Sequence, residues 1–175
     1  MQPMLGGQAT LVLGGARSGK SVFAEGLITE SGLSPVYIAT SQIYDDEMKA
    51  RVDAHRARRG PEWTTVHAPD KLEKAIEDYA VPGNGVLVDC LTLWITNLMM
   101  AQAPIGARCD GLLKTLSAIK SPVVLVSNEV GLGIVPDNKM AREFRDHAGR
   151  LHQEIAAVSK QVYFVAAGLP LTMKG

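Results

Sequence analysis

The residues from Gly14 to Ser21 carry the clearest chemical signal in this sequence. They read Gly-Gly-Ala-Arg-Ser-Gly-Lys-Ser, a complete phosphate-binding loop of the pattern G-x-x-x-x-G-K-S. In such loops Lys20 reaches the outer phosphates of a nucleotide, and the hydroxyl of Ser21 ligates Mg²⁺. An apolar run precedes the loop and helical spacing follows it, so backbone N–H groups and the helix dipole converge on an anion. This context favours a nucleoside triphosphate site over a glycine-rich turn with an exposed lysine.

A second candidate is Asp89, which ends the apolar run Val86–Val88. In nucleotide enzymes with such a loop, an aspartate at this place lies beside the triphosphate and orients Mg²⁺ or its water shell. The alternative is a carboxylate that caps a helix beginning near Leu91. We favour the metal role, because Mg²⁺ needs an acidic partner and few other residues are so placed.

A charged helix is expected over residues 45–59. Four of its residues recur at intervals of four and share one helical face: Glu47, Arg51, His55 and Arg59. One interpretation is a solvated helix with ion pairs between successive turns. The other is a nucleophilic imidazole at His55, with arginines that neutralise a phosphate brought to it. The spacing alone does not decide between them.

Composition excludes several classes of protein. The chain has 175 residues, with 18 basic and 18 acidic side chains, so nothing points to a nucleic-acid or anionic-membrane surface. Cys90 and Cys109 are the only cysteines, too few for a disulfide framework or a zinc cluster, and a reduced cytoplasm is the expected setting. Residues 1–7 lack the features of a signal peptide, and no apolar run is long enough for a membrane span.

Strands and helices are expected to alternate along the chain. The predicted strands cover residues 9–13, 35–39, 63–67, 86–89, 123–126 and 162–166. The predicted helices cover about 22–31, 45–59, 71–79, 91–101, 109–119 and 138–159, with a turn at 82–85 and a glycine-rich loop at 131–137. Continuous β-branched runs between helices indicate an α/β fold, a mostly parallel sheet with helices on both faces, in a single domain over residues 1–175.

Several segments in the same order along the chain resemble one known family. They are the phosphate loop 14–21, Tyr-Ile-Ala-Thr-Ser at 37–41, Asp-Asp-Glu-Met at 45–48 with Arg51 and His55, the loop from Ser127 to Pro136, and residues 144–151. Together they resemble the bifunctional adenosylcobinamide kinase / adenosylcobinamide-phosphate guanylyltransferase family of cobalamin biosynthesis. The loop Asn-Glu-Val-Gly-Leu-Gly-Ile-Val-Pro is far more specific than a phosphate loop alone.

The resemblance implies two reactions and an assembly. ATP or GTP phosphorylates the aminopropanol hydroxyl of adenosylcobinamide, and GTP then transfers its guanylyl group to that phosphate, giving adenosylcobinamide-GDP and pyrophosphate. The second transfer passes through a guanylylated histidine, which His55 matches. The family also implies a RecA-like P-loop fold, Mg²⁺ carried with the nucleotide, a homotrimer, and no nucleic-acid or membrane partner.

The family's nucleotide contacts carry over to three stretches and two single residues. These are Gly14, Gly15, Ala16, Arg17, Ser18, Gly19, Lys20 and Ser21; Ile38, Ala39 and Thr40; Arg56, Ala57, Arg58 and Arg59; His67; and Asp89. Lys20 and His55 are the expected catalytic residues, and Ser21 and Asp89 the expected metal-orienting pair.

Two positions depart from the family pattern, which has glutamate at His67 and asparagine at His152. A histidine is not a permanently ionised acceptor, so the first change bears on the guanine or ribose contact. We interpret His147 and His152 as structural or surface residues, since their spacing does not place them on a shared face. Glu129, in a loop with two glycines, is expected to bind the corrinoid side chain or the metal; the alternative is a helix or turn cap.

Two other functions fit parts of the sequence. A simple small-molecule or nucleotide kinase needs the phosphate loop and Asp89 but not His55. A nucleotide-driven switch or assembly module of the RecA kind hydrolyses or exchanges nucleotide without consuming a corrinoid. Guanylylation of His55 separates the family's activity from both.

Overall fold

The sheet at the centre of the molecule is built from the buried, β-branched runs of the sequence. In the computed structural model, which describes residues 8–175, its strand order is β3-β2-β4-β5-β1-β6-β7. The strands are β1 (Ala9–Gly14), β2 (Ser34–Ala39), β3 (Thr64–His67), β4 (Asn84–Asp89), β5 (Val123–Asn128), β6 (Gln161–Ala166) and β7 (Leu169–Lys174). All neighbours are parallel except β7, which pairs antiparallel with β6. Parallel strands place their carboxyl ends at one edge of the sheet, where ligands bind in such folds.

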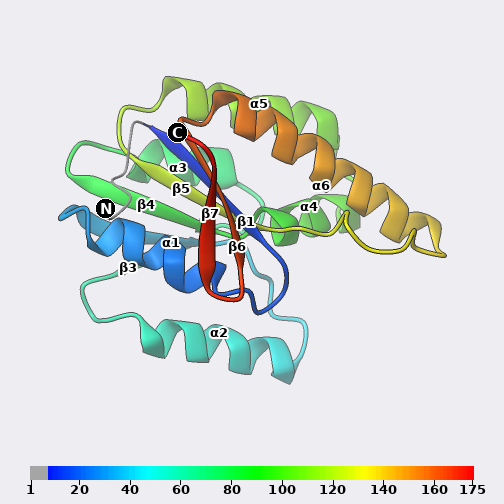
Figure 1. The fold of residues 1–175 in the computed structure, drawn as a ribbon, viewed down its shortest axis with the longest axis horizontal. Coiled ribbons are helices and arrows are strands. Elements are labelled where there is room, and N and C mark those ends of the chain that lie inside the picture. Colours follow the sequence, from blue (N-terminus) through cyan, green and yellow to red (C-terminus); the bar gives the residue numbers. More distant parts are fainter. Residues whose placement is uncertain (1–7) are drawn as a thin grey trace.

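Helices cover the two faces of the sheet unequally (Figure 1). They are α1 (Lys20–Thr29), α2 (Asp46–Arg58), α3 (Leu72–Tyr79), α4 (Leu91–Met100), α5 (Ile105–Ala118) and α6 (Lys139–Val158). The larger core joins α3, α4, α5 and α6 to one face, with Trp94 and Leu112 fully buried. The smaller core joins α1 to the other face around Val12 and Tyr37. Successive residues of each strand point to opposite faces of the sheet, so they contribute alternately to the two apolar layers.

Helix α2 stands apart from both cores. None of its residues is buried, and Figure 1 shows it at the lower edge of the view, beyond α1. Asp45 caps it by accepting a hydrogen bond from the Met48 N–H at 2.7 Å. An ion pair of 2.8 Å between Arg58 and Glu25 ties its last turn to α1. The helix is therefore held at its carboxyl end and exposed along its length.

Most predicted elements are confirmed, with shifts of a few residues at their ends. Strand β4 begins at Asn84, inside the predicted turn, and α5 begins at Ile105 rather than near Cys109. No strand is predicted after residue 166, yet β7 follows β6 through a two-residue turn at Ala167 and Gly168, both at positive φ. Pro170 argues against a strand in sequence, but an edge strand tolerates it.

None of the helices between residues 8 and 175 combines the length and apolar composition that spanning a bilayer requires. The expectation about a signal peptide concerns residues 1–7, which lie outside the described part of the chain.

Candidate active site

The phosphate loop joins the carboxyl end of β1 to the first turn of α1. Its backbone turns sharply, with Arg17 at φ +55° and Gly19 at φ +90°. Gly19 is the N-cap of α1, and no side chain caps the first N–H groups of this helix. Uncapped N–H groups and the helix dipole at such a helix start favour the binding of an anion, at the place where the sequence predicts one. Ala16 and Arg17 are exposed at the tip, and Ser21 is half-buried in the first helical turn.

Lys20 is the cation of this loop. Its residue is only 8% exposed, and its ammonium Nζ donates to the carbonyl oxygen of Gly15 at 3.0 Å. Burial lowers the pKa of Lys20, whereas the negative charge of Asp89 acts in the opposite direction. A bound phosphate would supply the charge that a single carbonyl partner lacks.

The turn between β6 and β7 braces the phosphate loop from the far end of the sequence. The Gly168 N–H donates to the Ser18 carbonyl at 2.7 Å, and a Cβ on Gly19 would lie 3.0 Å from the Gly168 Cα. A Cβ on Gly14 would lie 2.6 Å from the Val165 carbonyl oxygen. The Ser18 hydroxyl is buried without a hydrogen-bond partner. Sequence reasoning missed Gly168, because its role arises from a strand that the pattern does not predict.

Asp89 lies at the end of β4, on the same edge as the phosphate loop. Its carboxylate Oδ2 accepts a hydrogen bond of 2.8 Å from the hydroxyl of Tyr37, on the neighbouring strand β2. The N-cap of α4 is Cys90, and no side chain caps this helix. The capping alternative for Asp89 is therefore wrong.

The donors near the phosphate loop suit a metal that arrives with its nucleotide. Within residues 8–175, no group of three or more histidines, cysteines, aspartates and glutamates is arranged to hold a metal ion. Mg²⁺ prefers oxygen ligands and is commonly held by one or two protein groups together with substrate phosphates. The hydroxyl of Ser21 and the carboxylate of Asp89 fit that chemistry.

His55 lies in the last turn of α2 and is half-buried. Its Nδ1 is buried and has no hydrogen-bond partner. Among the described residues, no hydrogen bond or ion pair joins His55 to the phosphate loop. Exposed ion pairs between successive turns are present on the same helix, at 3.3 Å between Arg51 and Glu47, as the solvated-helix interpretation expects. Arg56 and Ala57 are exposed.

Arg59 departs from the predicted helical stripe, because α2 ends at Arg58 and Arg59 is extended, with ψ 139°. Its side chain is 4% exposed, and its guanidinium carbon lies 3.4 Å from the centre of the Tyr37 ring. Its Nη1 is 3.9 Å from a carboxylate oxygen of Glu25, which is too long for a hydrogen bond. Both Nη1 and Nε are buried without a partner. A cavity of about 330 Å³ adjoins the group, lined by Arg56, Arg59, Gly60, Pro61, Trp63 and Thr65.

The end of β2 lies between Asp89 and the edge of the sheet. Ile38 and Ala39 are buried, and Thr40 is fully buried. The Thr40 hydroxyl donates to the Cys90 carbonyl at 2.7 Å and accepts from the Cys90 N–H at 2.9 Å. Its side chain therefore fixes the crossing from β4 to α4.

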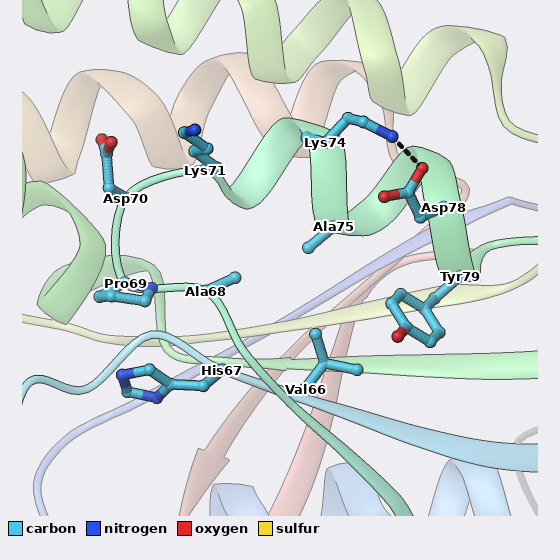
Figure 2. Close-up of a pocket in the computed structure, with 10 residues that line it drawn as sticks. All are labelled: Val66, His67, Ala68, Pro69, Asp70, Lys71, Lys74, Ala75, Asp78 and Tyr79. Atoms are coloured by element: carbon cyan, nitrogen blue, oxygen red, sulfur yellow. Dashed lines mark hydrogen bonds and ion pairs between the residues drawn. The ribbon is translucent and has the colours of Figure 1, made fainter.

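His67 ends β3, paired in register with Ala39, and is exposed. It borders a pocket of about 370 Å³ between β3 and α3. Figure 2 shows its ring at one end of the pocket, apart from Lys74 and Asp78, whose ion pair lies on α3. The pocket is lined by Val66, His67, Ala68, Pro69, Asp70, Lys71, Lys74, Ala75, Asp78 and Tyr79.

Glu129 follows β5, the strand between β1 and β4. Its N–H donates to the Gly14 carbonyl at 2.9 Å, so the loop after β5 starts beside the phosphate loop. Its side chain accepts a hydrogen bond from the Gly131 N–H, the contact that a turn cap makes.

His152 is buried in α6, and its Nε2 lies 2.6 Å from the hydroxyl oxygen of Ser127 on β5. Burial lowers the pKa of His152. Its interpretation as a structural residue is confirmed, and His147 is half-buried on the same helix.

Most of the predicted contacts thus meet at one edge of the sheet. The phosphate loop, Asp89 and residues 38–40 all lie at the carboxyl ends of adjoining strands, and His67 lies at the end of the edge strand β3. The residues 55–59 lie to the side, on α2 and just after it. Tyr37 connects the two groups, and no sequence pattern singled it out for this.

Comparison with known proteins finds one family to which this chain is similar. A family model described as cobinamide kinase / cobinamide phosphate guanyltransferase matches residues 10–173. The bifunctional adenosylcobalamin biosynthesis protein CobP of Pseudomonas aeruginosa is 48% identical over 169 residues, covering 94% of this chain and 96% of that protein. The corresponding CobU proteins of Escherichia coli and Salmonella typhimurium are 43% and 40% identical, each match covering 94% of this chain and 98% of the relative.

Solved structures resemble the chain in fold alone. The RadB recombinase is 16% identical with a TM-score of 0.52, covering 90% of this chain and 73% of that one. A second solved structure, an ATPase domain, is 13% identical with a TM-score of 0.50, covering 90% of this chain and 68% of that one. The predicted RecA-like P-loop fold, with a mostly parallel sheet, is confirmed.

Proposed function

The chain belongs to the cobinamide kinase / cobinamide phosphate guanyltransferase family, a family of transferases of cobalamin biosynthesis, and from that premise we propose its substrates, its steps and the residues that carry them. We infer that it acts on adenosylcobinamide and then on adenosylcobinamide phosphate. ATP or GTP is the phosphoryl donor, and GTP is the guanylyl donor.

In the first reaction the acceptor hydroxyl attacks the γ-phosphorus of the nucleotide. The bond between this phosphorus and the bridging oxygen breaks, the nucleoside diphosphate leaves, and the hydroxyl proton passes to solvent. Lys20 leaves the Gly15 carbonyl for the outer phosphates, and the first-turn N–H groups of α1 bind the phosphate oxygens. Ser21 and Asp89 would hold Mg²⁺, which would neutralise charge that develops on the phosphates.

In the second reaction a nitrogen of His55 attacks the α-phosphorus of GTP and pyrophosphate leaves. An oxygen of adenosylcobinamide phosphate then displaces the imidazole, giving adenosylcobinamide-GDP and free His55. One observation carries this half of the proposal: His55 and Arg59, at the same end of α2, both hold buried nitrogens without a hydrogen-bond partner. The Glu25 carboxylate lies 3.9 Å from Nη1 of Arg59, too far for a hydrogen bond, so a bound phosphate would satisfy donors that the protein leaves open.

The remaining nucleotide contacts are proposed from their positions at the same edge of the sheet. The backbone of residues 38–40 contacts the nucleotide, because the side chain of Thr40 is already bonded to Cys90. His67 lies at the same edge and contacts the base or ribose. Glu129, next to Gly14, contacts the corrinoid side chain or the metal.

We further propose that the chain forms a homotrimer and works in the cytoplasm. Exposed apolar side chains on one face of the edge strand β7 favour an assembly: Leu169, Leu171 and Met173. Both cysteines, Cys90 and Cys109, are free and buried, in keeping with a reducing compartment.

Labelling with GTP that carries its label on the α-phosphate tests the proposal. The wild-type protein should acquire acid-labile, base-stable label and pass it to adenosylcobinamide phosphate. His55→Ala should acquire none, whereas His147→Ala, a histidine on α6, should label normally. Absence of label on the wild type, or normal labelling of His55→Ala, would contradict the histidine mechanism.

Two outcomes identify the other functions. Phosphorylation of a small molecule without any protein label indicates a simple kinase. Nucleotide hydrolysis without consumption of a corrinoid indicates a switch or assembly module.

A further inference from the structure

Tyr37 contacts both charged parts of the candidate site. It lies in β2 and is 6% exposed. Its hydroxyl donates to Asp89 at 2.8 Å, and its ring lies 3.4 Å from the guanidinium carbon of Arg59. The ring also meets Trp63 edge-on, with centroids 6.4 Å apart at 79°.

Sheet register explains how the tyrosine reaches the aspartate. Tyr37 pairs with Leu87, and Ala39 pairs with Asp89, on the parallel neighbours β2 and β4. Tyr37, Leu87 and Asp89 therefore share a face of the sheet, because side chains alternate along a strand. The phenol ring of Tyr37 reaches diagonally across to β4, past its partner Leu87, to the carboxylate of Asp89 two residues further along that strand.

The bond to Asp89 is charge-assisted and sheltered. The Tyr37 residue is only 6% exposed, so water has little access to this bond. Hydrogen bonds to charged groups are stronger than those between neutral groups. This bond fixes one carboxylate oxygen and thereby the direction of the other.

The contact with Arg59 works through the face of the ring. A guanidinium over an aromatic face is attracted by the ring quadrupole, more strongly where water is excluded. The Arg59 side chain is 4% exposed, and its Nη1 and Nε have no hydrogen-bond partner, with Glu25 3.9 Å from Nη1. The ring thus holds the guanidinium in place while leaving its donors available.

We propose that Tyr37 is a positioning residue shared by the two phosphate-binding parts of the molecule: its hydroxyl aims Asp89 at the metal beside the phosphate loop, and its ring holds Arg59 at the end of α2. This inference rests on the proposed roles of Asp89 and Arg59. It assigns the two effects to different atoms of one side chain, so they can be separated.

Equilibrium binding of a fluorescent GTP analogue, titrated with Mg²⁺ and repeated in EDTA, tests the inference without measuring turnover. Tyr37→Phe should raise the Mg²⁺ midpoint about tenfold, since it loses a charged hydrogen bond but keeps the ring. Its affinity in EDTA should change by less than about twofold. Tyr37→Leu should raise the midpoint equally and also weaken metal-free binding by about fivefold, because the guanidinium loses its ring.

Tyr163→Phe is the matched control, because Tyr163 is a buried tyrosine in the same apolar layer, packed edge-on against Phe23. It should leave both measurements unchanged. A double-mutant cycle adds a second test: in an Asp89→Ala background, Tyr37→Phe should no longer shift the midpoint. Thermal unfolding of each variant confirms that it is folded.

An unchanged midpoint in Tyr37→Phe, or a shift that persists without Asp89, overturns the positioning role while the proposed function stands. Metal-free binding in Tyr37→Leu equal to that of Tyr37→Phe overturns the part that concerns Arg59. A wild-type protein whose GTP binding does not depend on Mg²⁺ overturns the proposed role of Asp89, and the inference with it.

Discussion

Replacement of Gly14 by alanine should lower the free energy of unfolding, because the structure leaves no room for a Cβ at this position. Gly14 is the last residue of β1 and pairs with Val165 of β6. An added Cβ would lie 2.5 Å from the Ser18 hydroxyl oxygen and 2.6 Å from the Val165 carbonyl oxygen. The first atom belongs to a side chain that can rotate, but the second is backbone in a paired strand. Either β1 parts from β6 or the phosphate loop shifts.

Overpacking of this kind costs about 1–3 kcal/mol. Because the obstructing atom is backbone, we expect Gly14→Ala to lower the free energy of unfolding by about 2 kcal/mol. Gly15→Ala is the matched control, since a Cβ there meets nothing within 4 Å and the residue has no positive φ. It should be neutral or stabilising by up to about 1 kcal/mol, through the reduced entropy of the unfolded chain.

Urea denaturation without nucleotide measures the free energy of unfolding of both variants. If its slope against urea concentration is the same in the variants and the wild type, the same unfolding reaction is being compared. A second measurement, GTP binding, should show Gly14→Ala weakened, because its phosphate loop is displaced. The reasoning fails if Gly14→Ala loses less than about 0.5 kcal/mol, or if Gly15→Ala loses as much as its neighbour.

Two further predictions concern stability. Arg108→Ala should lower the free energy of unfolding by about 1 kcal/mol after allowance for solvent screening, because the guanidinium bonds both Glu73 and Asp70 at 2.8 Å. Arg150→Ala is the comparison, because the ion pair of Arg150 is exposed, and its denaturation should match that of the wild type. Equal losses of stability in the two variants would contradict the argument. Burial lowers the pKa of His152 in the folded protein below its ordinary value of 6.5. As the pH falls, the histidine of the unfolded chain is therefore protonated before that of the folded protein. The stabilisation that the neutral His152 contributes is complete above pH 6.5 and is lost progressively below it. Denaturation at a series of pH values should show a slope of up to about 1.4 kcal/mol per pH unit from this group, absent in His152→Asn; parallel slopes would refute it.

The central strands β1, β4 and β5 are predictable because each is a short, β-branched run whose residues are buried on both faces of the sheet. The edge strand β3 is mostly exposed and is predictable instead from its alternating pattern. Strand β7 is not, because nothing local marks it. Its turn uses Ala167 at φ +51° rather than an Asn-Gly pair, and Pro170 is typical of a strand breaker. Pairing with β6 stabilises it, and pairing is a property of two segments.

The candidate site divides in the same way. The phosphate loop is contiguous, so its residues are predictable from spacing, and Asp89 is predictable because it ends a buried run. The contacts of Tyr37 and Arg59 depend on the register of β2 with β4 and on where α2 stops. Helical periodicity predicts that Arg59 shares a helical face with His55. The helix ends at Arg58 instead, and the extended backbone of Arg59 directs its guanidinium into a buried position.

The bond between Gly168 and Ser18 makes the nucleotide site depend on a hairpin far along the sequence. Whatever steadies the loop at residues 14–21 must also slow the opening of the β6–β7 turn. Amide hydrogens at residues 166–169 should therefore exchange with deuterium more slowly once nucleotide is bound. A carboxyl-terminal segment that looks peripheral in the sequence thus reports on occupancy at the opposite end of the polypeptide.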